Sequence, residues 1–135
     1  MALNCNDPLR VEAFYTKHFG FTRGRVYLPG PDQVVMIKSG ALYLELFPAK
    51  GEKPVAPAAK DGPEYSGWRH LAFLVDDLDA KLAEMGDDAV ISLGPLDMSV
   101  FIPGMRVVWL ADPEGNIVEL NQGYVDEENP PGFNS

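Results

Sequence analysis

The sequence is poor in cysteine, in basic residues and in long apolar runs. Its single cysteine, Cys5, cannot form a disulfide within the chain. Lys and Arg total 11 against 20 Asp and Glu, and the net charge of −9 disfavours contact with nucleic acid or anionic lipid. No apolar run approaches the ~18 residues of a membrane-spanning helix, and the N-terminus lacks the pattern of a signal peptide. The sequence therefore predicts a cytoplasmic protein that binds neither nucleic acid nor membranes.

Apolar residues are plentiful. They make up 46% of the 135 residues, and aromatic residues make up 10%. A chain of this length and composition can bury one hydrophobic core, so we expect a single domain.

Two segments carry the signals of a helix. In the first, Asp7 can cap a helix that begins at Pro8, and Gly20 suits its end. The apolar spacing i, i+3, i+4, i+7 between them is filled by Val11, Phe14, Tyr15 and His18. The second segment repeats this pattern, with Asp77 as the cap and Gly86 at the end.

Strand-like runs separated by turn residues surround these helices, and the two halves of the chain match. The segment ALNCNDP at 2–8 aligns with AFLVDDL at 72–78, an offset of 70 residues. Likewise YLELF at 43–47 aligns with IVELN at 117–121, an offset of 74 residues. Each half reads strand, helix and three strands, so the sequence predicts a duplicated module.

This repeat divides residues 1–135 without breaking them into separate domains. The first module covers 1–47, the second covers 67–121, and residues 48–66, rich in Pro, Ala, Gly and Lys, form a surface linker between them. Residues 122–135 form an acidic, proline-bearing tail. A frayed terminus is favoured there over an arm that covers a partner or the pocket.

Side chains alternate between the two faces of a strand, which sorts the polar residues. The runs WRHLAFLV, ALYLELF and NIVEL each have an aliphatic face that helices would cover. His70, Glu45 and Glu119 fall on the opposite face, amid apolar or aromatic neighbours. A carboxylate in such surroundings is costly unless it is paired, protonated or bound to a metal.

Each of the three residues also has an ordinary structural interpretation. His70 alone is more often a hydrogen-bonded structural histidine, and either glutamate alone is more often a surface charge on an edge strand. Because the repeat places both glutamates at equivalent positions, one divalent cation bound by all three is the favoured interpretation.

Other candidate motifs are weak. His18 lies in the last turn of the first predicted helix, where it favours the helix dipole or lies on the surface, so we interpret it as structural. The glycines follow neither a dinucleotide-binding nor a P-loop pattern, and no Ser or Cys stands near a base in a nucleophile motif. These absences disfavour hydrolases and nucleotide-binding proteins.

Four segments together resemble the vicinal oxygen chelate superfamily, which includes glyoxalase I, fosfomycin- and bleomycin-resistance proteins, methylmalonyl-CoA epimerase and extradiol dioxygenases. They are NDPLRVEAFYTKHFGF, LYLELF, GWRHLAFLVDDLDA and VVWLADPEGNIVEL, and the match extends to about Asn121. The resemblance implies an α+β fold of two βαβββ modules, with a mixed sheet curled around a metal-holding cavity and helices on the outer face. It also implies a homodimer.

Carried over from glyoxalase I, the metal ligands would be Glu45, His70 and Glu119. The fourth ligand, the repeat partner of His70, would lie one residue before Met1. Asn4 lies about 13 Å further along the strand and Cys5 points to the other face, so neither replaces it easily. Three explanations stay open: the start of the chain is mis-set or trimmed, water completes the site, or this family member has given up its metal.

The resemblance implies a glyoxalase I-like lyase or isomerase that acts on a small substrate with vicinal oxygens through an enediolate-type intermediate. The cofactor would be one divalent ion of nickel, zinc, manganese, cobalt or iron. Glu119 would be both ligand and catalytic base, and Glu45 is the second choice for proton transfer.

Two other functions stay open. The alternative is a metal-free binding protein of the bleomycin-resistance kind, which sequesters a drug or other small molecule. The pocket residues would then be Tyr43, Phe47 and Trp68. An extradiol dioxygenase is the third option. The site of those enzymes resembles two histidines and one glutamate on iron, and only one of those histidines is available here.

Overall fold

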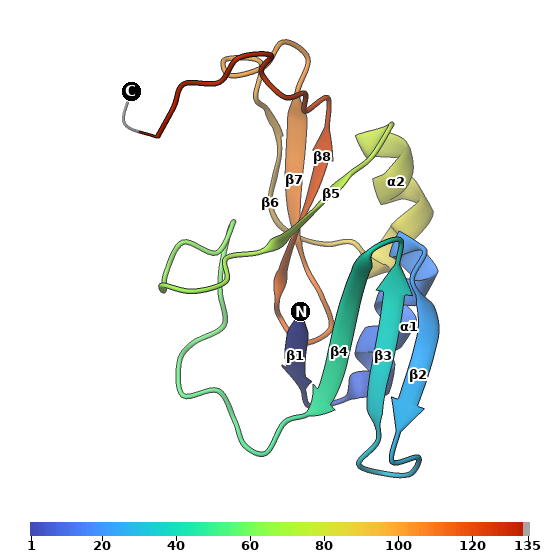
Figure 1. Ribbon diagram of the computed structural model, residues 1–135. Helices are drawn as coiled ribbons and strands as arrows, with labels where there is room; N and C mark the ends of the chain where they lie inside the picture. The colour runs from blue at the N-terminus through green and yellow to red at the C-terminus, as the bar shows by residue number, and fades with distance from the viewer. Residues whose placement is uncertain (134–135) are drawn as a thin grey trace.

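The chain folds into two copies of one unit of strand, helix and three further strands (Figure 1). The structure is a computed structural model that describes residues 1–133, so the last two residues of the predicted tail lie outside the described part. The first unit consists of β1 (Ala2–Cys5), α1 (Pro8–Phe19), β2 (Thr22–Tyr27), β3 (Val34–Ser39) and β4 (Leu42–Pro48). The second consists of β5 (Leu71–Leu74), α2 (Leu78–Met85), the short 3-10 helix η1 (Gly86–Asp88), β6 (Val90–Asp97), β7 (Arg106–Ala111) and β8 (Ile117–Gln122). The predicted α+β class with two βαβββ modules is confirmed.

Each module forms its own four-stranded mixed sheet, in the orders β1-β4-β3-β2 and β5-β8-β7-β6. The first strand of each module pairs in parallel with the last, and the other pairs are antiparallel. In the register, Ala2 lies opposite Glu45 and Ala72 lies opposite Glu119. The two glutamates therefore occupy equivalent positions, as the repeat predicts.

Both helices begin at their predicted capping aspartates. The side chain of Asp7 accepts a hydrogen bond from the Arg10 backbone N–H, and that of Asp77 accepts one from the Ala80 N–H. These bonds satisfy N–H groups that the first turn leaves without helical partners. Gly20 ends α1 in the left-handed conformation at a φ of 69°, which a glycine adopts without strain.

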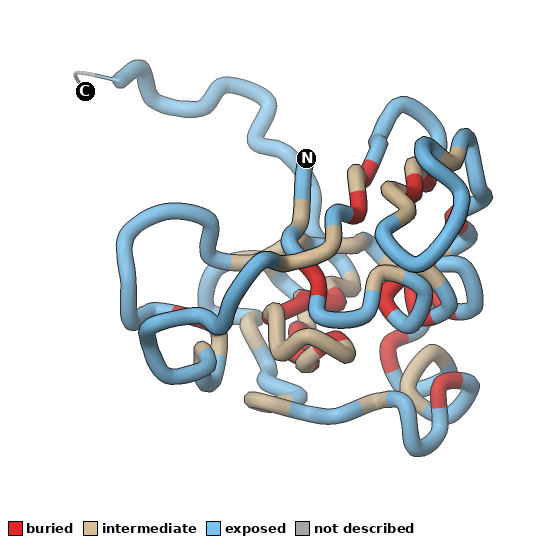
Figure 2. Tube along the Cα trace, turned by 90° about the horizontal axis from the view of Figure 1, so that it is seen from below, coloured by how far each residue is buried: buried red, intermediate tan, exposed pale blue. Residues whose placement is uncertain are grey.

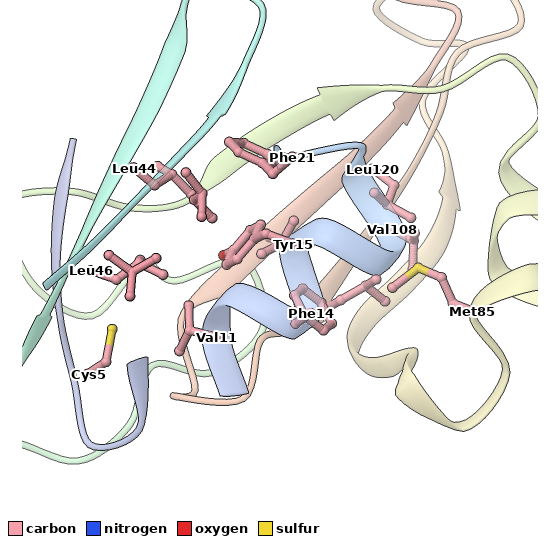
Figure 3. Packing of buried hydrophobic residues seen from close by; sticks show 14 of the residues in the cluster. Cys5, Val11, Phe14, Tyr15, Phe21, Leu44, Leu46, Met85, Val108 and Leu120 are labelled. Carbon is pink, nitrogen blue, oxygen red and sulfur yellow. The ribbon is translucent and has the colours of Figure 1, made fainter. Parts of the chain in front are cut away.

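One hydrophobic core joins the two modules (Figure 3). It contains the faces of β4 and β8 that the alternation predicts, including Leu44, Leu46, Val118 and Leu120. Both helices pack into it, and together they lie on one side of the molecule (Figure 1). Burying each large aliphatic side chain contributes about 1.5–3 kcal/mol. Within residues 1–133, no helix covers the opposite faces of the two sheets, which carry the candidate site residues.

His18 is buried, with 4% exposure, so the suggestion that it lies on the surface is wrong. Its Nε2 lies 2.8 Å from a carboxylate oxygen of Asp88, and its carbonyl accepts from Lys81. Because both partners belong to the second module, His18 ties α1 to that module. The interpretation of His18 as structural is retained.

The chain after β8 is exposed through residues 123–133 and runs away from the sheets (Figure 2). Within the described residues, no helix is both long enough and apolar enough to cross a membrane.

Candidate metal centre

His70 and Glu119 lie together on the helix-free face of the second sheet. His70 immediately precedes β5, and Glu119 lies on the neighbouring strand β8. The Nε2 atom of His70 is 3.4 Å from Oε1 of Glu119, and each side chain is 17% exposed. The sequence-predicted pair is therefore brought together, largely shielded from solvent.

A backbone contact sets the tautomer of His70. Its Nδ1 lies 2.8 Å from the carbonyl oxygen of Asp61. Because a carbonyl oxygen can only accept, Nδ1 must carry the proton in this contact. In the neutral ring, Nε2 then presents its lone pair toward the carboxylate of Glu119.

This arrangement fits a divalent cation. Two acceptor atoms 3.4 Å apart repel one another unless a cation or a proton lies between them. Ligands about 2.0–2.2 Å from one metal ion are themselves about 3–3.5 Å apart, so the spacing suits two neighbouring ligands. An imidazole with a carboxylate is a donor set suited to zinc, nickel, cobalt or iron.

Two buried polar atoms beside the pair have no hydrogen-bond partner. They are Nε1 of Trp109 and Oδ1 of Asn121. No other buried side-chain nitrogen or oxygen in residues 1–133 lacks a hydrogen-bond partner. Trp109 lies opposite Glu119 on β7, and Asn121 follows Glu119 by two residues, so all three share one face. The amide nitrogen of Asn121 is 3.5 Å from Oε2 of Glu119. The unpaired polar atoms thus flank the candidate ligands.

Glu45 does not join the other two residues within one chain. Across the described part of the chain, no three His, Cys, Asp or Glu side chains are grouped so that they could hold a metal ion. The expectation that all three face one cavity is therefore not met by a single copy. Glu45 lies instead on the helix-free face of the first sheet.

The three predicted pocket aromatics are exposed. Trp68 is 90% exposed, Tyr43 is 45% exposed and Phe47 is 38% exposed. Two cavities, of about 450 and 490 Å³, are lined by other residues. The first lies between the end of α1 and the start of α2, and the second lies between α1, η1 and the end of β7. Neither His70 nor Glu119 lines these cavities, so the cavities are separate from the candidate site.

Cys5 is excluded as a ligand by its surroundings. It is fully buried in the core, and burial, with smaller contributions from Glu114, Asp112 and Asp7, raises its pKa to about 12. A thiol must lose its proton to bind metal, so Cys5 is inert at neutral pH.

Three parts of the site are not predicted from the sequence. Trp109 and Asn121 fall on the same sheet face as Glu119, so the strand alternation that identifies Glu119 also points to them. The Asp61 carbonyl has no comparable signal, because it is a backbone atom in a segment without periodicity.

The comparisons with known proteins identify the family. The model of the Glyoxalase/Bleomycin resistance protein/Dioxygenase superfamily matches residues 1–120. The chain belongs to this superfamily. A relative in Escherichia coli (strain K12), the uncharacterized protein YaeR, is 32% identical over 127 residues, which cover 89% of this chain and 91% of YaeR.

Solved structures of the superfamily share the fold over most of the chain. A glyoxalase/dioxygenase from Nostoc punctiforme has a TM-score of 0.70 at 22% identity, with 93% of this chain and 89% of that chain covered. A lactoylglutathione lyase from Agrobacterium tumefaciens has a TM-score of 0.55 at 26% identity, with 91% and 90% covered.

Proposed function

We propose that this protein is a metal-dependent lyase or isomerase of the glyoxalase I type. It would act on a small substrate with vicinal oxygens through an enediolate-type intermediate. The observation that carries the proposal is the His70–Glu119 pair, in which a protonated Nδ1 leaves Nε2 facing a carboxylate at 3.4 Å. Membership of the superfamily and the likeness to a lactoylglutathione lyase support it.

The roles follow from the chemistry of the two side chains. His70 and Glu119 hold one divalent ion of nickel, zinc, manganese, cobalt or iron. When bound, such an ion stabilises negative charge on two neighbouring oxygens of a substrate. Glu119 takes a proton from the substrate carbon and returns it to the adjacent carbon, so the reaction is balanced without an oxidant.

We further propose that Glu45 reaches the metal from a second copy of the chain. Among the residues that the structure describes, one copy gives His70 and Glu119 no third His, Cys, Asp or Glu beside them, and Glu45 lies on a separate open face. In a symmetric dimer, the helix-free face of the first sheet in each copy can lie against the helix-free face of the second sheet in the other copy. This arrangement would complete two identical sites. Tyr43, Phe47 and Trp68, exposed in one copy, would then line the substrate pocket.

Mixing two inactive variants tests this arrangement. Glu45→Gln and Glu119→Gln should each lack turnover of a thiol adduct of a 2-oxoaldehyde, measured with zinc present. A mixed dimer has one site with both defects and one with neither, so co-expression should restore about a quarter of the wild-type activity per chain.

Each variant expressed and purified alone is the control for this experiment. If the co-expressed pair stays as inactive as the separate variants, although mass spectrometry shows mixed dimers, the two-copy site is wrong.

A further inference from the structure

The segment before β5 folds back onto the candidate metal site. It belongs to the predicted linker, which lies on the side of the molecule away from the helices (Figure 1). We propose that the turn at Asp61–Gly62 is a positioning element for His70. By accepting from Nδ1 at 2.8 Å, the Asp61 carbonyl fixes the ring orientation and keeps Nε2 available to a cation. This inference rests on the proposed function.

The turn is held in place by its own contacts. The carboxylate of Asp61 accepts from Nη2 of Arg69 at 2.6 Å, and the Asp61 carbonyl also accepts from Nε of Arg69 at 3.3 Å. Arg69 directly precedes His70, so this clamp ties the turn to the backbone that carries the ring. The Gly62 N–H donates to the Ala59 carbonyl at 2.8 Å, which closes the turn.

Further contacts fasten the segment to the second sheet. The Ser92 hydroxyl on β6 donates to the Lys60 carbonyl at 2.7 Å. Ala58 packs on the cluster that contains Trp109. Lys60 has a φ of 52°, a conformation that a residue other than glycine keeps only where its surroundings impose it. The segment is thus an ordered part of the site as well as a linker.

Gly62 is the residue that permits the close approach. It is buried and has a φ of +80°, and a Cβ at this position would lie 2.8 Å from the Arg69 carbonyl oxygen. Such a contact is shorter than van der Waals distance and falls on backbone, so a side chain here must push the turn away from Arg69 and His70.

Replacing Gly62 with Ala should therefore weaken zinc binding by about 10–100-fold, the usual effect of losing the partner of a ligating histidine. Affinity is measured by competition with a chromophoric chelator. The matched control is Gly51→Ala, in the same linker, where a Cβ meets nothing within 4 Å and no change is expected.

A second readout does not depend on metal. Imidazole ¹⁵N shifts of His70 in metal-free protein, at about pH 8 and above the ordinary histidine pKa, report the tautomer. Wild type and Gly51→Ala should show the proton on Nδ1, and Gly62→Ala should show a mixture. Should Gly62→Ala fail to fold, Arg69→Ala, which removes the exposed clamp alone, should shift both readouts in the same direction by less.

Unchanged affinity and tautomer in a folded Gly62→Ala protein would overturn the inference and leave the proposed function standing. If wild type binds no zinc at all, the proposed function fails, and the tautomer measurement still decides whether the turn positions His70.

Discussion

Glu119→Gln is expected to weaken zinc binding by more than about 100-fold and to abolish turnover. The change keeps the shape of the side chain but removes the anionic oxygen 3.4 Å from Nε2 of His70. Losing a hydrogen-bond partner of a metal ligand lowers metal affinity by about 10–100-fold, so losing a ligand itself should lower it further. Chelator competition and a turnover assay measure the two effects on the same samples.

Glu84→Gln is the matched control, because Glu84 lies exposed on α2 and, among residues 1–133, its carboxylate pairs only with Lys81, at 3.5 Å. It should behave as wild type. The alternative function, a metal-free protein that sequesters small molecules, predicts a different result for Glu119→Gln. Small-molecule binding would be nearly intact, and there would be no bound metal to lose. If Glu119→Gln retains both zinc affinity and turnover, Glu119 is neither ligand nor base.

Asp112→Ala is expected to lower the free energy of unfolding by about 3–5 kcal/mol. Asp112 is 5% exposed, and its carboxylate accepts from the Tyr15 hydroxyl at 2.8 Å. It also accepts from the backbone N–H groups of Glu114 and Asn116, each at 2.9 Å. Alanine would leave all these donors without their partner and would detach α1 from the turn that leads into β8. Chemical denaturation measures the change.

Two companion variants separate the contributions. Tyr15→Phe removes only the buried hydroxyl and should cost about 1 kcal/mol. Asp32→Ala, at an exposed position between β2 and β3, should stay within about 0.5 kcal/mol of wild type. A loss below about 1 kcal/mol for Asp112→Ala would show that this carboxylate does not join the modules.

The fold is predictable from the sequence because its signals are local and repeated. Asp7 and Asp77 cap helices through bonds to residues three positions on, and strand alternation assigns Leu44 and Val118 to the core. Each of these effects needs only neighbouring residues and a regular period. The match between the halves then predicts the same succession of strand, helix and three strands in both modules, which the structure has.

The candidate site is predictable only in part, because it depends on contacts between distant segments. Alternation places His70, Glu45 and Glu119 on helix-free faces but does not say which of these faces meet. The core shared by the two modules decides this, and it leaves Glu45 apart from the other two. The Asp61 carbonyl depends on the path of an aperiodic segment, which no residue pattern reveals.

The metal content of the protein, purified without chelators, decides whether His70 and Glu119 bind a metal ion. Elemental analysis should find about one divalent nickel, zinc, manganese, cobalt or iron ion per chain in the wild type and none bound to Glu119→Gln. Wild-type protein that carries only trace metal, and that takes up none when zinc is supplied, would show that the protein is not a metal-dependent enzyme.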